Sequence, residues 1–166
     1  MTEVSESKRL WRTALIVAGG GLLLLIPLTW LAVRMWEDRN QRLIMAANES
    51  AALTNLEKIQ VAEQYYFDAN GQYGTYRQLV DSGILQSEAS GDPPTASGYV
   101  FDVRVQPKTD ARPAAYSVNV DPVRAGGRDA TGRRHFFASS EVIGVRFHES
   151  RPATKDDKPR PKMSEY

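Results

Sequence analysis

The chain contains no cysteine, which excludes a disulfide framework, a thiolate metal site and a cysteine nucleophile. It has only two histidines, His135 and His148, and their spacing fits neither HxxxH nor HExxH, so we expect no histidine-rich metal centre. Lys+Arg 21 nearly balance Asp+Glu 20. Because nucleic-acid binding needs a basic excess on some face, we expect no nucleic-acid partner.

Charge is also absent from one long segment, residues 13–33, which has the sequence TALIVAGGGLLLLIPLTWLAV. About 20 apolar residues cross the hydrocarbon core of a bilayer, whereas the apolar region of a cleaved signal peptide is about 7–15 residues long. The segment also leads through Trp30 and Trp36 into charged residues, as membrane anchors do. It therefore predicts an uncleaved transmembrane helix in contact with the lipid bilayer.

The orientation of this helix does not follow from charge alone. Basic residues are equal in number on its two sides: Lys8, Arg9 and Arg12 before it, and Arg34, Arg39 and Arg42 after it. Only residues 1–12 precede the span, and Glu37 and Asp38 lie among the downstream basic residues. These two features favour a cytoplasmic N-terminus and an exoplasmic C-terminal domain over residues 34–149.

Residues 34–69 contain neither proline nor glycine and are rich in helix formers, so they predict a helix. Apolar residues recur at three- and four-residue steps and form one stripe: Ile44, Ala47, Ala51 or Ala52, Leu56, Ile59, Ala62 and Tyr66. We expect Glu49, Lys58 and Glu63 to lie away from this stripe. A stripe of this kind needs a partner surface to cover it.

Residues 70–97 predict a loop that contains one short helix. Gly71 suits the position that follows a helix end, and Thr75 with Gln78 forms a capping box for a helix that Gly83 ends. Residues 87–97, with the sequence SEASGDPPTAS, predict a loop by composition.

Residues 98–148 predict a sheet of three or four consecutive antiparallel strands, because the links between them are too short for crossover helices. Apolar and polar residues alternate over 98–106, 115–120 and 134–148, and the step Ser139–Ser140 favours a tight turn. The expected fold class is α+β, with the long helix packed on the sheet. Residues 150–166 lack periodicity and predict a disordered tail.

An anchor helix that continues as an amphipathic helix and packs on an antiparallel sheet resembles type IV pilins and type II secretion pseudopilins. Two sequence segments strengthen the resemblance. Residues 55–79, NLEKIQVAEQYYFDANGQYGTYRQL, are similar to the region where such proteins leave the long helix, and residues 134–144, RHFFASSEVIG, are similar to their closing strand-turn-strand. The resemblance implies a bacterial inner-membrane protein with a periplasmic domain that binds other membrane or pilin-like subunits.

The chain departs from this family at the processing site. Filament-forming members have a Gly before Phe-Thr-Leu-Ile-Glu, whereas residues 12–18 here are RTALIVA, and the whole span 13–33 contains no Glu. The resemblance therefore implies a pilin-like protein that stays in the membrane. An unpaired carboxylate in the lipid is costly in free energy, so a Glu in the span is expected only where another subunit provides a partner for it.

No catalytic or cofactor-binding residues are expected. Ser139 and Ser140 lack a GxSxG frame, and Gly126–Gly127 lacks the GK[ST] ending of a phosphate loop. Asp121 and Asp129 leave two alternatives open, a calcium site, as in some pseudopilins, or a solvated turn, and the interleaved Arg124 and Arg128 favour the turn. We expect both histidines to be structural.

One aromatic group has two interpretations, a binding groove or the seam between helix and sheet: Tyr65, Tyr66, Phe67, Tyr73, Tyr76, Tyr99, Phe101 and Tyr116. The seam is favoured because a small domain needs its largest side chains in its core. Taken together, the sequence predicts a non-enzymatic single-pass membrane protein without cofactor, metal or small-molecule substrate. The resemblance implies that it is a component or accessory of a type IV pilus or type II secretion assembly; the alternative is a membrane-anchored interaction module that joins no filament.

Overall fold

The computed structural model describes the backbone of residues 3–160 and the side chains of residues 27–160. Within this range the chain forms two helices, α1 (Glu3–Asn70) and α2 (Tyr76–Asp81), and one five-stranded sheet. It divides into two compact units, Met1–Asn40 and Gln41–Tyr166. The second unit holds the C-terminal part of α1, helix α2 and the whole sheet.

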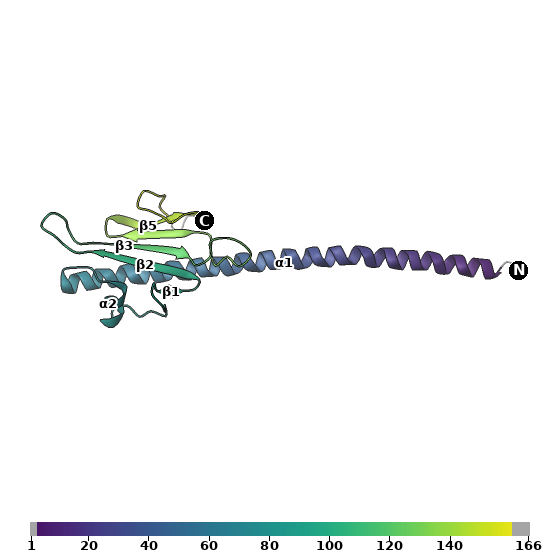
Figure 1. Cartoon of the computed structure of the whole chain (residues 1–166), viewed down its shortest axis with the longest axis horizontal. Helices are drawn as coiled ribbons and strands as arrows, with labels where there is room; N and C mark the ends of the chain where they lie inside the picture. Colours follow the sequence, from purple (N-terminus) through teal and green to yellow (C-terminus); the bar gives the residue numbers. More distant parts are fainter. Residues whose placement is uncertain (1–2, 161–166) are drawn as a thin grey trace. The chain divides into compact units, whose positions relative to one another are not determined.

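The sheet is an antiparallel meander in the order β1 (Thr95–Ala96), β2 (Tyr99–Gln106), β3 (Ala115–Pro122), β4 (His135–Ser139) and β5 (Val142–His148). Figure 1 shows β2, β3 and β5 lying alongside the C-terminal part of α1. A helix packed with an antiparallel sheet confirms the predicted α+β class. The apolar residues of each central strand alternate, and those of one face pack on α1.

The C-terminal part of α1 buries one face of the helix in the core. Ala52, Leu56, Ile59 and Ala62 from the predicted stripe are at most 2% exposed. Ile44, which was expected to begin the stripe, is 47% exposed, so the packed face starts later in the helix than predicted. These residues join a single cluster with side chains from all three central strands, among them Phe101, Val118 and Phe136.

Helix α2 forms as the sequence predicted, and its capping box is present. The Thr75 hydroxyl accepts a hydrogen bond from the Gln78 backbone N–H, and the Gln78 side chain accepts one from the Thr75 N–H at 2.8 Å. Gly71 ends α1 with a left-handed φ of 69°. The helix matters to the core because it buries Leu79 completely.

The expected number of three or four strands is wrong, because the structure has five. The additional strand, β1, has only two residues and lies in the segment 87–97 that was expected to be a loop. It pairs with the start of β2 through a two-residue turn in which Ser97 and Gly98 have φ values of 50° and 73°. Two residues are too few to show an alternation of apolar and polar side chains, and the Gly, Ser and Pro content of segment 87–97 favoured a loop, so β1 was not predicted.

The strand β5 departs from the alternation expected over residues 134–148, because Ile143 does not face the core. Between the pairs Phe137↔Arg146 and Ser139↔Val142 there is one residue in β4 and three in β5, so β5 bulges there. Gly144, with a φ of 78°, lies in this bulge, and Ile143 is 97% exposed. The tight turn itself is at Ser140–Glu141, one residue later than expected.

The prediction of a disordered tail is wrong for residues 150–160. Ala153 is 1% exposed, and its carbonyl accepts a hydrogen bond from the Asn119 side chain at 2.9 Å. Further on, the Phe147 N–H donates to Lys158 O and the Arg160 N–H donates to Val145 O, so the segment covers the outer edge of β5. An open strand edge offers backbone groups that even a polar segment can bind. Residues 161–166 lie outside the described residues.

The expected transmembrane segment, 13–33, falls mostly on residues whose side chains are not described, namely 13–26, and the N-terminal segment 1–12 lies there too. Among the described residues, no helix has an apolar stretch sufficient to cross a bilayer.

Candidate functional site

The residues considered for catalysis are not brought together. The Nδ1 of His135 lies 2.6 Å from Asp121 Oδ1, and the His135 side chain is buried, an arrangement consistent with the structural role expected for it. Four residues of strand, or about 13 Å, separate His135 from Ser139. Ser139 Oγ and Ser140 Oγ each accept a backbone N–H, from Glu141 and Tyr116 respectively. Both hydroxyls therefore support the β4–β5 turn.

The alternative of a calcium site at Asp121 and Asp129 finds no support in the geometry. The Asp121 carboxylate is turned to His135, and Asp129 contributes a main-chain oxygen that accepts from Arg124 Nε at 2.8 Å. In the part of the chain that the structure describes, no cluster of three or more His, Cys, Asp or Glu residues could hold a metal ion.

The glycine-rich segment that contains Gly126–Gly127 is the β3–β4 loop, residues 123–134, and α1 holds this loop through polar contacts. The Gln41 amide donates to Ala130 O at 2.7 Å, and the Asn48 amide donates to Thr131 O at 2.8 Å. The Glu49 carboxylate accepts the backbone N–H groups of Arg133 and Arg134 at 3.0 and 3.3 Å. The loop is thus docked on α1 through these contacts.

A second contact fixes the same loop from the sheet side. The Tyr99 hydroxyl donates to Arg134 O at 3.0 Å and occupies the space beside Gly132. A Cβ atom at Gly132 would lie 1.9 Å from this hydroxyl oxygen, so only glycine fits. Burial raises the pKa of Tyr99 above its ordinary value, consistent with a neutral hydroxyl that serves as a hydrogen-bond donor.

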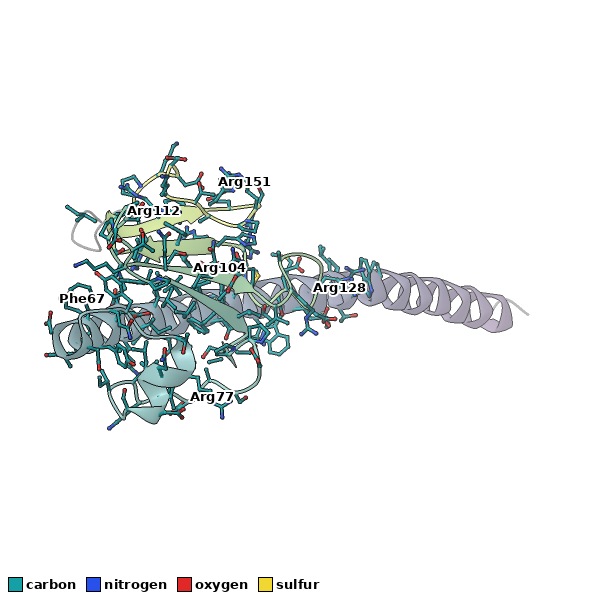
Figure 2. The ribbon with its side chains drawn as sticks, turned by 60° about the vertical axis from the view of Figure 1, so that its left-hand side comes forward. Phe67, Arg77, Arg104, Arg112, Arg128 and Arg151 are labelled. Atoms are coloured by element: carbon teal, nitrogen blue, oxygen red, sulfur yellow. The ribbon has the colours of Figure 1, made fainter. Side chains whose placement is uncertain are left out.

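The aromatic group forms the seam between helix and sheet. Tyr99, Phe101 and Tyr116 are buried, while Tyr66, Tyr73 and Tyr76 pack against the core from its margin. The ring of Tyr73 lies 4.6 Å from that of Phe67 and 4.8 Å from that of Tyr116, measured between centroids. Figure 2 shows Phe67 near the C-terminal end of α1, where this stack closes the core. Burial raises the pKa of Tyr116 to about 12. Tyr65 is the exception, because it is 64% exposed.

Glu63 is the residue that sequence reasoning placed wrongly. It was expected to lie away from the apolar stripe, yet it is 0% exposed. Its Oε2 accepts the Gly74 N–H at 2.9 Å, and its Oε1 is buried with no hydrogen-bond partner among the described residues. Burial raises the pKa of the Glu63 carboxyl to about 7, and the Gly74 hydrogen bond limits the rise. The signal was available: Glu63 follows Leu56 by seven residues and so shares its helix face.

The first unit presents a different surface, which we name the apolar collar. It consists of large apolar side chains of α1 that are each at least 51% exposed: Leu28, Trp30, Leu31, Val33, Met35 and Trp36. Successive residues of a helix are 100° apart, so these side chains point in every direction around the axis. The Arg34 guanidinium lies 4.6 Å from the Trp30 ring centroid. A helix that is apolar all round is typical of an apolar environment on every side.

Hollows in the surface of the second unit are shallow and lack reactive clusters. Two lie on the outer face of the sheet, with volumes of 470 and 440 Å³, and both are lined by Arg104, Phe137 and Lys155. Arg104, which Figure 2 shows on the sheet, is paired with Asp102. These hollows arise where residues 152–155 cross the strands, and they hold no combination of base, nucleophile and oxyanion donor.

Comparison of the chain with protein-family models, with curated proteins and with solved structures found no match. The resemblance to pilins and pseudopilins therefore stays a prediction.

Proposed function

We propose that this chain is a non-enzymatic, single-pass membrane protein that acts through its helix and its pilin-like domain as a component or accessory of a type IV pilus or type II secretion assembly. The observation that carries the proposal is the contrast along α1. Its C-terminal part buries one face on a sheet, while residues 28–36 leave apolar side chains exposed in all directions.

This contrast supports two environments for one helix. A helix in water buries a stripe and exposes mostly polar residues elsewhere, and residues 41–70 follow this pattern apart from the exposed Leu43, Ile44, Val61 and Tyr65. The apolar collar has no such polar face, and it directly follows the charge-free residues 13–26. Lipid surrounds a helix on all sides and therefore covers such a surface completely, whereas a single protein partner covers only one stripe of it.

The topology of the proposal is tested by cysteine labelling, for which the absence of native cysteine provides a clean background. The full chain carries either Asp110→Cys, in the exposed β2–β3 loop, or Ser5→Cys, near the N-terminus. We expect a membrane-impermeant maleimide to label Asp110→Cys in intact spheroplasts and to label Ser5→Cys only after lysis. Labelling in the opposite order would contradict the proposed orientation, and release of the chain from membranes by alkaline carbonate would contradict the anchor.

Membership of an assembly needs a second experiment. Leu31→Cys lies in the apolar collar, and Arg77→Cys, on the exposed face of α2, is its matched control. We expect a maleimide that carries a photoreactive benzophenone, attached at Leu31→Cys, to link the chain on irradiation to another membrane subunit only in cells that produce the pilus or secretion assembly. An adduct that forms without the assembly supports the alternative, an anchored interaction module outside any filament.

That alternative has an observation of its own in the processing region. Residues 12–18 lack the cleavage Gly and the span 13–33 lacks Glu. N-terminal sequencing of the purified protein should therefore find the original N-terminus, with or without the initiator Met. Cleavage near Arg12 would instead identify a matured pilin.

A further inference from the structure

A short loop, residues 71–75, covers the C-terminal end of α1 and joins it to α2. The loop is thin, because Gly71 and Thr75 are exposed and Gly74 is buried against the helix. Both of its ends are fixed. The Gly71 N–H donates to Phe67 O at 2.7 Å, and Thr75 caps α2. Only the middle of the loop is therefore free to move without breaking a helix end.

The Glu63 carboxyl lies under this loop and is shut off from water. The side chain is 0% exposed, its Oε2 accepts the Gly74 N–H at 2.9 Å, and its Oε1 is buried with no hydrogen-bond partner among the described residues. Within the same residues, no Lys, Arg or His forms an ion pair with Glu63. A neutral carboxyl tolerates such a site, whereas an ionised one lacks both water and a counter-ion.

The side chains around Glu63 offer it no compensating charge. Tyr116 of β3 is the titratable group that faces the carboxyl from the sheet, and the ring of Tyr73, in the loop, lies 4.8 Å from that of Tyr116. Burial raises the pKa of Tyr116 to about 12, so its hydroxyl stays neutral between pH 5 and pH 8. From α2, the apolar Leu79 lies next to Gly74.

Among the elements around Glu63, the loop is the one that can move away at the lowest cost. Helix α1 is held by its own hydrogen bonds, and β3 is paired on both sides, with β2 and with β4. The backbone of residues 72–74 makes a single hydrogen bond among the described residues, the one to Glu63. Local opening of a fold occurs where few such bonds must break.

We propose that ionisation of Glu63 promotes a local opening of the loop 71–75 while the sheet stays folded. Opening admits water to the carboxylate and separates the Tyr73 ring from the rings of Phe67 and Tyr116, on which it stacks (Figure 2). The pH around the domain therefore sets how often this aromatic stack is exposed. This device goes beyond the proposed membrane anchor and assembly and does not depend on them.

The direction of the pH response follows from the two forms of the loop. Burial raises the pKa of Glu63 to about 7 in the closed form, whereas water in the open form returns it to 4.5. Protons therefore favour the closed form, and this advantage is complete below pH 4.5 and is lost as the pH rises through 7. Between pH 5 and pH 8 the population of the open form should rise about thirtyfold.

Native-state hydrogen exchange of the full chain in nonionic detergent tests the proposal, with the amides of Gly74 and of Val118 in β3 as reporters. After correction for intrinsic exchange rates, protection of the Gly74 amide should fall about thirtyfold from pH 5 to pH 8. At pH 8, low concentrations of urea should leave this protection unchanged and should reduce that of Val118, because only global unfolding exposes enough surface to respond. Equal urea dependence of the two amides would overturn the proposal, because Glu63 would then be released only by global unfolding.

Variants assign the response to one carboxyl. Glu63→Gln keeps an oxygen that accepts the Gly74 N–H and has no proton to lose, so its Gly74 protection should not depend on pH. Glu57→Gln removes an exposed carboxylate from the same helix and should respond like the parent. A pH response that persists in Glu63→Gln would refute the proposal. The urea comparison uses the parent alone, so it decides the proposal even where Glu63→Gln folds poorly.

Discussion

Glu63 gives the domain a pH dependence that a single substitution should remove. Its carboxyl is 0% exposed, and burial raises its pKa to about 7 from 4.5. The folded state therefore binds a proton more tightly than the unfolded chain does. The stabilisation from this proton is complete below pH 4.5 and is lost as the pH rises through 7.

The size of the effect follows from the two pKa values. Integrated between pH 5 and pH 8, and allowing for some screening by water, the loss is about 2 kcal/mol. Glu63→Gln replaces the carboxyl by a neutral amide whose oxygen still accepts the Gly74 N–H. The stability of the variant relative to the parent should increase by about 2 kcal/mol between pH 5 and pH 8.

The measurement is urea unfolding of the full chain in nonionic detergent, followed by the near-ultraviolet circular dichroism of the buried tyrosines. The control is Glu57→Gln on the exposed face of the same helix, which should leave the pH dependence of the parent unchanged. Equal pH slopes for the parent and Glu63→Gln would refute the reasoning, because the carboxyl would then ionise freely in the fold. If Glu63→Gln has a lower free energy of unfolding than the parent at pH 8, the ionised carboxylate has a favourable partner in the fold.

Two further substitutions test how the loops are held. Gly132→Ala places a Cβ 1.9 Å from the Tyr99 hydroxyl oxygen and should lower the free energy of unfolding by about 1–3 kcal/mol, as measured by urea unfolding; a variant as stable as the parent would disprove the close approach. Thr75→Ala removes the hydroxyl that accepts the Gln78 N–H and should lower the free energy of unfolding by about 1 kcal/mol. Thr75→Ser keeps a hydroxyl at this position and should retain the stability of the parent, and urea unfolding distinguishes the two variants.

Local chemistry explains where the sequence predicted the fold well. The end of α1 at Gly71, the capping box of Thr75 and Gln78, and the alternating strand β2 all depend on neighbours within a few residues. The strand β1 and the bulge at Gly144 were missed for the opposite reason. A two-residue strand exists only because β2 is there to pair with it, and a bulge is defined by its partner strand.

The candidate sites show the same division. The sequence was sufficient to argue that His135 is structural and that the aromatic group is core, because a small domain has few other uses for such side chains. For Glu63 the spacing from Leu56 indicated the helix face, but the backbone partner that accompanies its burial, the Gly74 N–H, comes from the loop that follows α1.

The sequence by itself determined the charge-free segment 13–33, the α+β class and the faces of the central strands, because these follow from composition and local periodicity. The tertiary structure alone decided which polar residues are buried and that residues 150–160 cover β5. The physical reason is that burial and charge pairing are properties of surfaces that meet, and such surfaces come from segments far apart in the chain.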